Sequence, residues 1–421
     1  MYRELEDMQS QGRFFKVGLV GGGFMGRGIV EVLENVPGMK VVALADIDIE
    51  RAARCFENIP CTVRTDDSKG PVKDIAFPEE RVITDDFRLI PGLEGIDMVI
   101  EATGKPAIGA ETAFLSMVRG KHTGMLNVET DATVGPYLGM LAKRMGTVYT
   151  VCAGDEPAAV VELVDFARLC GCTVVAAGKG KNNPLDNHGT PRSLEKRAKS
   201  SGLNPKMLTE FVDGTKTMVE MCCAANSAGL DIDVRNMHGP SADVADLPKV
   251  FSTGEGGVLE KEGVVDYIIG DLAPGVFAVV RPKGPVADRT LRYLRVGEGP
   301  NYALVRPYHL TNLEVPLTVA NACLHGRASM TPGKPRLEVI TRAKKDLKKD
   351  DVIDGFGGEC VYGGIERSAT AEQEGLLPMG LCEGARVRED IARDEVIKKS
   401  SVEVVDSILL QFRKIQEAVF T

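Results

Sequence analysis

The fold is decided by residues 16–27, KVGLVGGGFMGR, close to the start of the chain. The first five residues of this stretch favour a short, mostly apolar β-strand. Three glycines follow at G-x-G-x-x-G spacing, namely Gly21, Gly23 and Gly26, and residues 28–33 then have the pattern of a helix. The stretch therefore predicts a strand, a glycine turn and a helix, in that order.

Each of the three glycines has a physical role in a turn that binds a dinucleotide. Gly21 permits a tight turn, Gly23 lets the backbone approach a pyrophosphate, and Gly26 lets the helix pack closely on the strand. The helix N-terminus, which follows Phe24 and Met25, then faces the anion. We expect these five residues to bind the cofactor, and the alternative is a tight turn in some other α/β unit.

An acidic residue ends the second predicted strand, residues 40–45 (KVVALA). Asp46 lies 46 − 26 = 20 residues beyond the third glycine. An acid at this distance can accept the ribose hydroxyls and disfavours a 2′-phosphate. We therefore predict an N-terminal Rossmann domain that binds NAD or NADP, and Asp46 by itself favours NAD.

The composition limits the class of protein. A chain of 421 residues suggests two or three domains. Hydrophobic residues make up 43% and charged residues 26%, as in soluble globular proteins, and no apolar stretch approaches the roughly 20 residues that span a bilayer. The net charge of −9 argues against a nucleic-acid partner, although a local basic pocket can still hold an anionic substrate.

The cysteines and the N-terminus indicate the cytoplasm. The ten cysteines are scattered, without a C-x-x-C pair, and are interpreted as reduced thiols. Residues 1–15 mix acids and bases without an apolar core, so they resemble neither a signal peptide nor a transit peptide. We interpret them as a helix that packs through Tyr2, Leu5 and Met8.

A strand at residues 96–102 (IDMVIEA) delivers polar residues to the carboxyl edge of the predicted sheet. Ligands of open α/β sheets bind beyond this edge, so Thr103 and Gly104 are candidate neighbours of the nicotinamide ribose or the pyrophosphate. The alternative is an ordinary turn between a strand and a helix.

Residues 122–127 predict the next strand, which ends beside Asn127, Glu129 and Asp131. We expect Asn127 to bind the cofactor and Glu129 to face the substrate. The alternative is that the cluster caps the following helix, which we favour for Asp131.

A lysine pair follows the β-rich residues 172–178 (CTVVAAG). Lys179 and Lys181 lie in a glycine-permissive turn, where two ammonium groups can hold a phosphate, a carboxylate or a developing enolate. The alternative is a solvated turn. We expect Lys179 to polarise a substrate oxygen and Lys181 to bind the anionic end of the substrate.

Residues 207–226 (MLTEFVDGTKTMVEMCCAAN) predict a buried helix beyond residue 214. Lys216 and Glu220 lie four residues apart and so share one face. Charges in an apolar helix must pair, bind a ligand or line a wet cavity. The alternatives are an internal ion pair and an active-site face on which Asp213 and Glu220 orient Lys216, with Asn226 as a substrate contact.

The rest of the middle region predicts an α+β domain. We expect turns between short strands over residues 271–299, with 276–280 (VFAVV) the clearest strand. Residues 302–310 predict a strand that ends in His309, which is a substrate contact or a structural residue. Residues 313–324 predict a helix.

The pattern changes to short β segments after a loop at residues 327–336. Two segments of similar sequence, 346–353 and 390–397, predict turns that each precede a strand. Residues 402–420 predict a C-terminal helix. We therefore divide the chain into a Rossmann domain (1–153), an α+β substrate and oligomerisation domain (154–335) and a small β domain (336–421).

The order of these motifs resembles the homoserine-dehydrogenase-like oxidoreductases with a C-terminal SAF domain. The motifs are KVGLVGGGFMGRG, IEATG, NVETDA, AAGKG, DGTKTMVEM, RPYHL and DLKKDDVIDGFGGECVYG, and they span nearly the whole chain. Within that group the chain is most similar to the deoxyxylulose-phosphate reductoisomerase-like enzymes.

The resemblance implies conversion of 1-deoxy-D-xylulose 5-phosphate to 2-C-methyl-D-erythritol 4-phosphate with NADPH, in isoprenoid synthesis, by a homo-oligomer. The better-known members use a divalent metal, and we identify no ligand set for one here. Two other hypotheses stay open. One is a dehydrogenase or oxidoisomerase of another polyol, sugar acid or hydroxy amino acid, and the other is a catalytically silent nucleotide sensor.

Overall fold

The computed structural model describes residues 1–66 and 79–420. The chain divides into two compact units, which are Met1–Ala158 with Leu310–Pro332 and Ala159–His309 with Gly333–Thr421. The division into three domains stays a prediction. In the structure, residues 310–332 group with the N-terminal unit rather than with the segment that precedes them.

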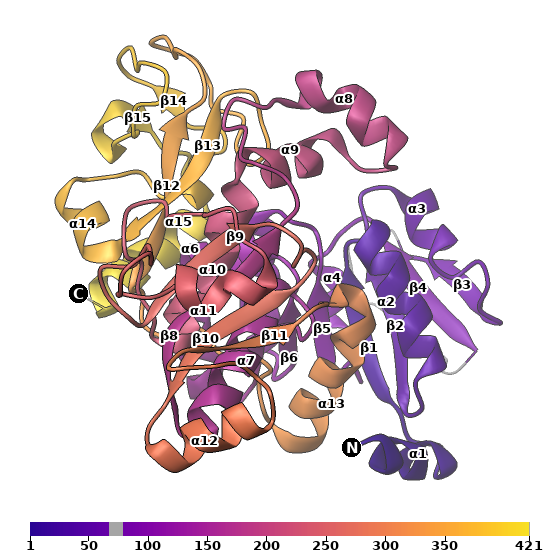
Figure 1. Cartoon of the computed structure of the whole chain (residues 1–421). Helices are drawn as coiled ribbons and strands as arrows, with labels where there is room; N and C mark the ends of the chain where they lie inside the picture. The colour runs from indigo at the N-terminus through magenta and orange to yellow at the C-terminus, as the bar shows by residue number, and fades with distance from the viewer. Residues whose placement is uncertain (67–78, 421) are drawn as a thin grey trace. The chain divides into compact units, whose positions relative to one another are not determined.

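A parallel sheet with the order β3-β4-β2-β1-β5-β6-β7 forms the first unit, as far as the chain is described (Figure 1). Its strands are β1 (Phe15–Val20), β2 (Met39–Ala45), β3 (Thr62–Thr65), β4 (Glu80–Thr84), β5 (Met98–Glu101), β6 (His122–Met125) and β7 (Tyr149–Val151). The order reverses at β1, which pairs with β2 on one side and β5 on the other. The predicted Rossmann-type fold is confirmed, and its switch point lies where the glycine turn follows β1.

Helices flank this sheet, and one of them comes from late in the chain. They are α1 (Tyr2–Ser10), α2 (Phe24–Asn35), α3 (Ile49–Arg54), α4 (Leu89–Gly92), α5 (Pro106–Met117), α6 (Val128–Met145) and α13 (Val315–His325), the last preceded by the 3₁₀ turn η2 (Thr311–Glu314). The orange α13 lies beside the indigo α2 in Figure 1, and its Val315 and Val319 belong to the same core as Ile29 and Leu33 of α2. A helix predicted for the middle domain thus completes the first unit.

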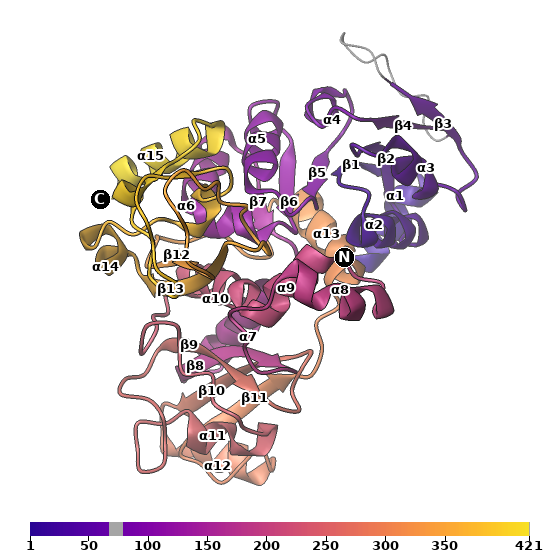
Figure 2. The ribbon, with the colours of Figure 1, turned by 90° about the horizontal axis from the view of Figure 1, so that it is seen from above.

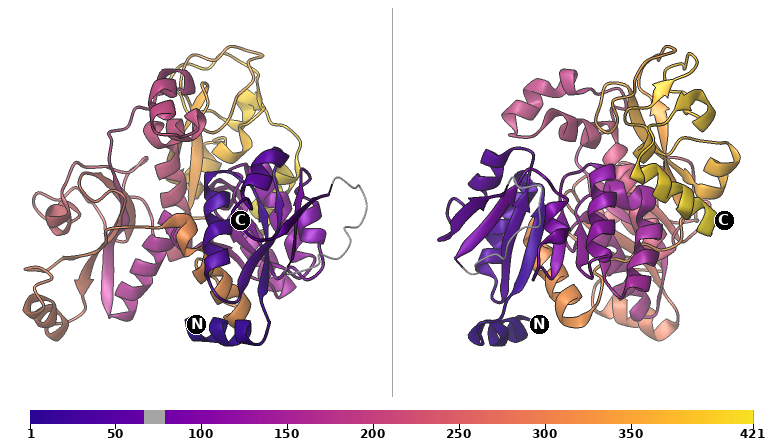
Figure 3. Two further views of the ribbon diagram at one scale, coloured as in Figure 1. Left: turned by 90° about the vertical axis from the view of Figure 1, so that its right-hand side faces the viewer. Right: turned by 180° about the vertical axis from the view of Figure 1, so that it is seen from behind.

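The N-terminal helix α1 packs through only part of its predicted stripe. Leu5 and Met8 are buried, but Tyr2 is 61% exposed, so the prediction for Tyr2 is wrong. The helix lies beside α13, as both views of Figure 3 show, and it also contacts the connection between α2 and β2, where the N–H of Gly38 donates a 2.9 Å bond to the side chain of Gln9.

The second unit is built on a four-stranded mixed sheet with the order β11-β10-β8-β9, within the described residues. Its strands are β8 (Cys172–Lys181), β9 (Val264–Ile269), β10 (Val276–Pro282) and β11 (Tyr302–Arg306). β8 pairs parallel with β9 and antiparallel with β10. The predicted α+β character of this region is therefore present.

Helices of the second unit lie before, between and after these strands. They are α7 (Glu156–Leu169), which begins in the first unit, α8 (Pro191–Ser200), α9 (Pro205–Asp213), α10 (Thr215–Ala228), α11 (Leu247–Val250), α12 (Pro285–Tyr293) and the 3₁₀ turn η1 (Val244–Asp246). Figure 2 shows α11 and α12 beside β10 and β11. The strand expected at residues 276–280 is confirmed as part of β10, but the turns and short strands expected over the rest of 271–299 are wrong where Pro285, at the first helical position, starts α12.

The buried helix expected beyond residue 214 is confirmed as α10, and a separate helix, α9, precedes it. Gly214 has φ +89°, which ends α9 and begins α10 in the left-handed region. Only glycine adopts this conformation readily, so the chain turns here. The turn leaves Asp213 and Thr215 at adjoining helix ends.

The C-terminal part is a small β module, as expected, and its assignment to the SAF type stays a prediction. Its elements are β12 (Leu337–Ala343), β13 (Val361–Arg367), α14 (Ser368–Gln373), η3 (Met379–Leu381), β14 (Arg386–Val387), η4 (Lys399–Ser401), β15 (Val402–Glu403) and α15 (Ile408–Phe420). The segments 346–353 and 390–397 pair with each other, since the backbones of Leu347 and Ile391 exchange two hydrogen bonds of 2.9 Å. The last helix begins at Ile408 rather than at Val402, because Val402 pairs with Val387 in a strand.

Two further findings complete the fold. The edge strand β3 lies between α3 and β4, and residues 67–78 of the same segment lie outside the described residues. Across residues 1–66 and 79–420, no helix combines the length and the apolar character needed to cross a membrane.

Candidate dinucleotide site and a buried lysine pair

The glycine turn has the geometry that the sequence predicts. Gly21 has φ +104°, and a side chain there would lie 2.9 Å from the backbone of Ala102. A Cβ added at Gly26 would lie 2.0 Å from the carbonyl oxygen of Gly21. A Cβ added at Gly23 would meet no atom within 4 Å. The backbone is therefore closely packed at two glycines and open at the third.

The open position is also the start of a helix without a side-chain cap. Gly23 is the N-cap of α2, and as a glycine it supplies no side-chain hydrogen bond to the first turn. The first N–H groups of a helix need acceptors, and together with the helix dipole they favour an anion. The site thus fits a pyrophosphate, at the residues from Gly21 to Gly26, including Phe24 and Met25.

Asp46 ties the glycine turn to the end of β2. Its Oδ2 accepts a 2.7 Å hydrogen bond from the N–H of Gly22, and its Oδ1 accepts a 2.8 Å bond from the N–H of Asp48. The guanidinium of Arg51 binds both oxygens, at 3.1 Å and 2.5 Å. Burial by itself raises the pKa of Asp46, but the hydrogen bonds from Arg51, Asp48 and Gly22 outweigh it, so this pKa is lowered. Sequence reasoning missed Arg51.

The end of β5 lies against the glycine turn, as expected. The N–H of Ala102 donates a 2.8 Å bond to Val20, and Gly104 has φ +67°. The side chain of Thr103 and its N–H both donate to Oε1 of Glu101. Burial raises the pKa of Glu101 to about 7. Glu101 was not predicted, although an acid in the otherwise apolar run IDMVIEA is the signal that could have found it.

The polar cluster at the start of α6 has a different cap from the one expected. Asn127 is the N-cap, since its Oδ1 accepts a 3.1 Å bond from the N–H of Thr130 and its Nδ2 donates a 3.0 Å bond to Lys105. Asp131 lies one turn inside the helix, so the capping role favoured for it is wrong. Glu129 is buried, and its charge contributes to raising the pKa of Glu101.

In the second unit, β8 carries the predicted lysine pair on one face, because side chains two apart in a strand point the same way. Lys179 Nζ lies 2.5 Å from Oε2 of Glu220, and both side chains are buried. Lys181 donates to the carbonyl oxygen of Phe211. Burial, followed by the charge of Lys179, lowers the pKa of Lys181 to about 8. The alternative of a solvated turn is therefore wrong.

Asp213 pairs with a lysine from the C-terminal module, and its predicted role of orienting Lys179 and Lys216 stays a prediction. Lys344 Nζ lies 2.9 Å from Oδ2 of Asp213 and also donates to the carbonyl oxygens of Gly189 and Gly358. Burial, opposed mainly by Lys344, raises the pKa of Asp213. The partner lies 131 residues away in the sequence, so spacing along the chain could not reveal it. Lys216 is half-buried on α10.

Asn226 and His309 are two further predicted substrate contacts. The amide of Asn226 accepts hydrogen bonds from the N–H groups of Arg336 and Leu337 and donates one to Leu337, so it fastens α10 to β12. His309 is half-buried beyond the end of β11. The substrate-binding roles of both residues stay predictions.

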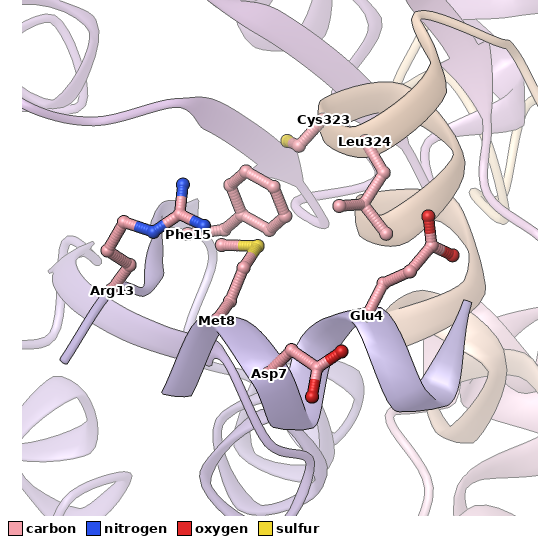
Figure 4. Close-up of a pocket in the computed structure, with 7 residues that line it drawn as sticks. All are labelled: Glu4, Asp7, Met8, Arg13, Phe15, Cys323 and Leu324. Carbon is pink, nitrogen blue, oxygen red and sulfur yellow. The ribbon is translucent and has the colours of Figure 1, made fainter. Parts of the chain in front are cut away.

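A hollow of about 440 Å³ lies between α1, β1 and α13 (Figure 4). Phe15, the first residue of β1, lines it, whereas the glycine turn follows Val20 at the other end of the strand. Six residues of strand place these ends roughly 17 Å apart. This hollow is therefore not the candidate dinucleotide site.

The middle of the chain is similar to a known catalytic domain. Residues 154–315 match the family model described as "Oxidoreductase DRL, catalytic domain". The matched segment contains the lysine pair of β8 and all of α10. No curated protein matches the chain.

Solved structures resemble the chain at low similarity. An NAD binding oxidoreductase from Klebsiella pneumoniae is 17% identical, with a TM-score of 0.30, over 42% of this chain and 47% of that one. Apo scyllo-inositol dehydrogenase from Lactobacillus casei is 13% identical, with a TM-score of 0.28, over 40% and 47%. GenD2 from gentamicin A biosynthesis, in complex with NAD, is 13% identical, with a TM-score of 0.39, over 75% and 88%. The chain spans about half the length of the first two, and these values transfer no function to it.

Proposed function

We propose that this chain is an NAD(P)-dependent oxidoreductase that acts on a small anionic α-hydroxyketone. The observation that carries the proposal is the open, uncapped helix N-terminus at Gly23, beside an otherwise closely packed glycine turn. The match of residues 154–315 to an oxidoreductase catalytic domain supports the same class.

The finer proposal is a reductoisomerase that converts 1-deoxy-D-xylulose 5-phosphate to 2-C-methyl-D-erythritol 4-phosphate. The bound dinucleotide would supply the hydride that reduces the rearranged aldehyde. The proton that the aldehyde oxygen takes up comes from a lysine ammonium, for which Lys179 and Lys216 are the candidates. Glu220 is proposed to orient Lys179 through the buried ion pair between them.

Lys181 is proposed to bind the phosphate or carboxylate of the substrate. Its ammonium is buried, and its pKa of about 8 leaves it mostly charged at neutral pH. We further propose a cytoplasmic homo-oligomer whose partners are small molecules rather than nucleic acid or membranes, consistent with the net charge of −9.

Titration of the protein with NADH and NADPH, followed by turnover assays, tests this function. The assays follow cofactor oxidation with 1-deoxy-D-xylulose 5-phosphate and with a panel of other α-hydroxyketones, polyols and hydroxy acids. Turnover of the first substrate supports the reductoisomerase, and turnover of another supports the wider oxidoreductase class. Tight cofactor binding without any turnover would favour a nucleotide sensor, and absence of binding would contradict the whole proposal.

A substitution in α10 tests the proposed chemistry. We expect Lys216→Ala to reduce kcat by at least about a hundredfold, the usual scale of general acid catalysis, while the Kd of the cofactor stays unchanged. The matched control is Lys206→Ala, at an exposed position of α9, which should keep the wild-type kcat. Retained activity in Lys216→Ala would remove this residue from the mechanism.

A further inference from the structure

We infer that Arg51 sets the choice of dinucleotide at this site, so that the site accepts the 2′-phosphate of NADP(H) despite Asp46. This inference rests on the proposed function. Asp46 alone, at its distance from the third glycine, would favour NAD. The hydrogen bonds around its carboxylate lead to the opposite preference.

The carboxylate of Asp46 is already occupied by protein donors. The backbone N–H groups of Gly22 and Asp48 each donate a hydrogen bond to one carboxylate oxygen. Arg51 donates two more, from Nε to Oδ2 and from Nη2 to Oδ1. Two carboxylate oxygens offer about four acceptor positions, so these four bonds use them all. A ribose hydroxyl would have to displace Arg51 before it could donate to Asp46.

The charge of Asp46 is also balanced. A lone carboxylate repels a 2′-phosphate, but a bidentate guanidinium brings the net charge of the pair to zero. The side chain of Arg51 is 42% exposed, so part of it faces solvent. A guanidinium suits a phosphate especially well, because its planar donors match two oxygens.

No other arginine of α3 has this position. Arg54, one turn further along, lies 4.0 Å from Asp48 and 3.8 Å from Glu50, and no hydrogen bond joins it to Asp46 within the described residues. The difference makes Arg54 a matched control for Arg51. Both are arginines of the same helix with substantially exposed side chains.

The test compares dissociation constants of NADPH and NADH, measured by titration, for the wild type, Arg51→Gln, Arg51→Lys and Arg54→Gln. We expect the wild type to bind NADPH at least as tightly as NADH. Arg51→Gln should raise the Kd of NADPH by about tenfold to a hundredfold, as expected for loss of a hydrogen bond between charged groups. The Kd of NADH should stay the same or fall. Arg51→Lys should keep part of the preference, and Arg54→Gln should keep all of it.

The outcomes separate this inference from the function on which it rests. If the wild type binds both dinucleotides and their ratio is the same in Arg51→Gln, the inference is overturned and the proposed function stands. The same holds if the wild type binds NADH alone. If the wild type binds neither, both are overturned. Melting temperatures close to that of the wild type confirm that the variants are folded.

Discussion

A methyl group added at Gly26 would lie 2.0 Å from the carbonyl oxygen of Gly21, whereas one added at Gly23 would meet no atom within 4 Å. Gly26 is therefore needed for the helix to pack against the turn. Gly23 has φ −69°, which any residue adopts, and nothing in the described chain fills the space beside it. The protein itself therefore leaves room for a side chain at position 23, and a bound ligand would be the reason for a glycine there.

Gly23→Ala tests this distinction directly. We expect its melting temperature to match the wild type within about 2 °C, because alanine costs nothing in this conformation. We expect the Kd of the dinucleotide to rise at least about tenfold, since the methyl occupies the space of the pyrophosphate. Gly92→Ala is the control, because its Cβ also meets nothing within 4 Å. Unchanged dinucleotide binding in Gly23→Ala would show that no ligand approaches this backbone.

Lys181 predicts a pH dependence of substrate binding. Burial lowers the pKa of its ammonium to about 8, so the charge is present below this pH and is lost as the pH rises through it. If Lys181 binds the anionic end of the substrate, KM should rise above pH 8, by up to about tenfold per pH unit. Steady-state kinetics between pH 6 and pH 10 measure this rise.

Two variants show whether Lys181 is its source. Lys181→Met should have a raised KM that no longer changes near pH 8, because no ammonium titrates there. Lys196→Met, at an exposed position of α8, should keep the wild-type profile. A rise in KM that persists in Lys181→Met would place the titrating group elsewhere.

At the scale of elements, a buried ion pair joins the turn between α9 and α10 to the end of β12. Lys344 directly follows β12 and donates to the backbones of Gly189 and Gly358 as well as to Asp213. An ammonium can donate three hydrogen bonds, so these three acceptors satisfy it. The cluster gives Asp213 a structural role that a prediction based on α10 alone could not foresee.

Lys344→Met should destabilise the protein by about 3 kcal/mol, because it leaves the carboxylate of Asp213 buried without its partner. Urea unfolding measures the change. Lys345→Met, the exposed neighbour, is the control and should have little effect. The double variant Lys344→Met with Asp213→Leu should recover part of the loss. Wild-type stability in Lys344→Met would mean that the pair contributes nothing to folding.

At the scale of the whole molecule, the chain returns to its first unit after passing through the second. Residues 310–332 bring η2 and α13 against α2, where Asn312 lies directly over Gly28. The hydroxyl of Thr318 accepts a 2.7 Å bond from the N–H of Ala153. The unit with the candidate dinucleotide site is therefore complete only when a late segment of the chain has joined it.

Dinucleotide binding should accordingly stabilise the intact chain. A ligand at a hundred times its Kd adds about 2.7 kcal/mol if it binds only the folded state, so the melting temperature should rise by a few degrees and depend on ligand concentration. Thermal melts with and without NADPH measure the shift. Gly23→Ala at the same ligand concentration should show about half of this shift or less, because a Kd raised tenfold leaves the ligand at only about ten times the Kd of the variant. A wild-type melting temperature that neither dinucleotide changes would contradict the proposed site.

The local parts of this structure could be predicted from the sequence because their causes are local. The glycine spacing after an apolar strand determines the turn, and alternation and apolar runs determine most strands of the parallel sheet. The two lysines of β8 point the same way because they are two residues apart. Glu220 lies in the buried helix α10, and a buried carboxylate without a partner is costly because it loses its contact with water. Lys179 is its partner.

What only the tertiary structure decided are the contacts between distant segments. The contact of Lys344 with Asp213, 131 residues apart, and the return of α13 to the first unit each depend on where the chain folds in space. The same holds for Asn127 rather than Asp131 as the cap of α6, since the bond from Asn127 to Lys105 joins two helix starts. A sequence pattern indicates the period of a strand or helix and the propensities of its residues. It does not indicate which side chains from distant parts of the chain will pack together, because that depends on the folded arrangement.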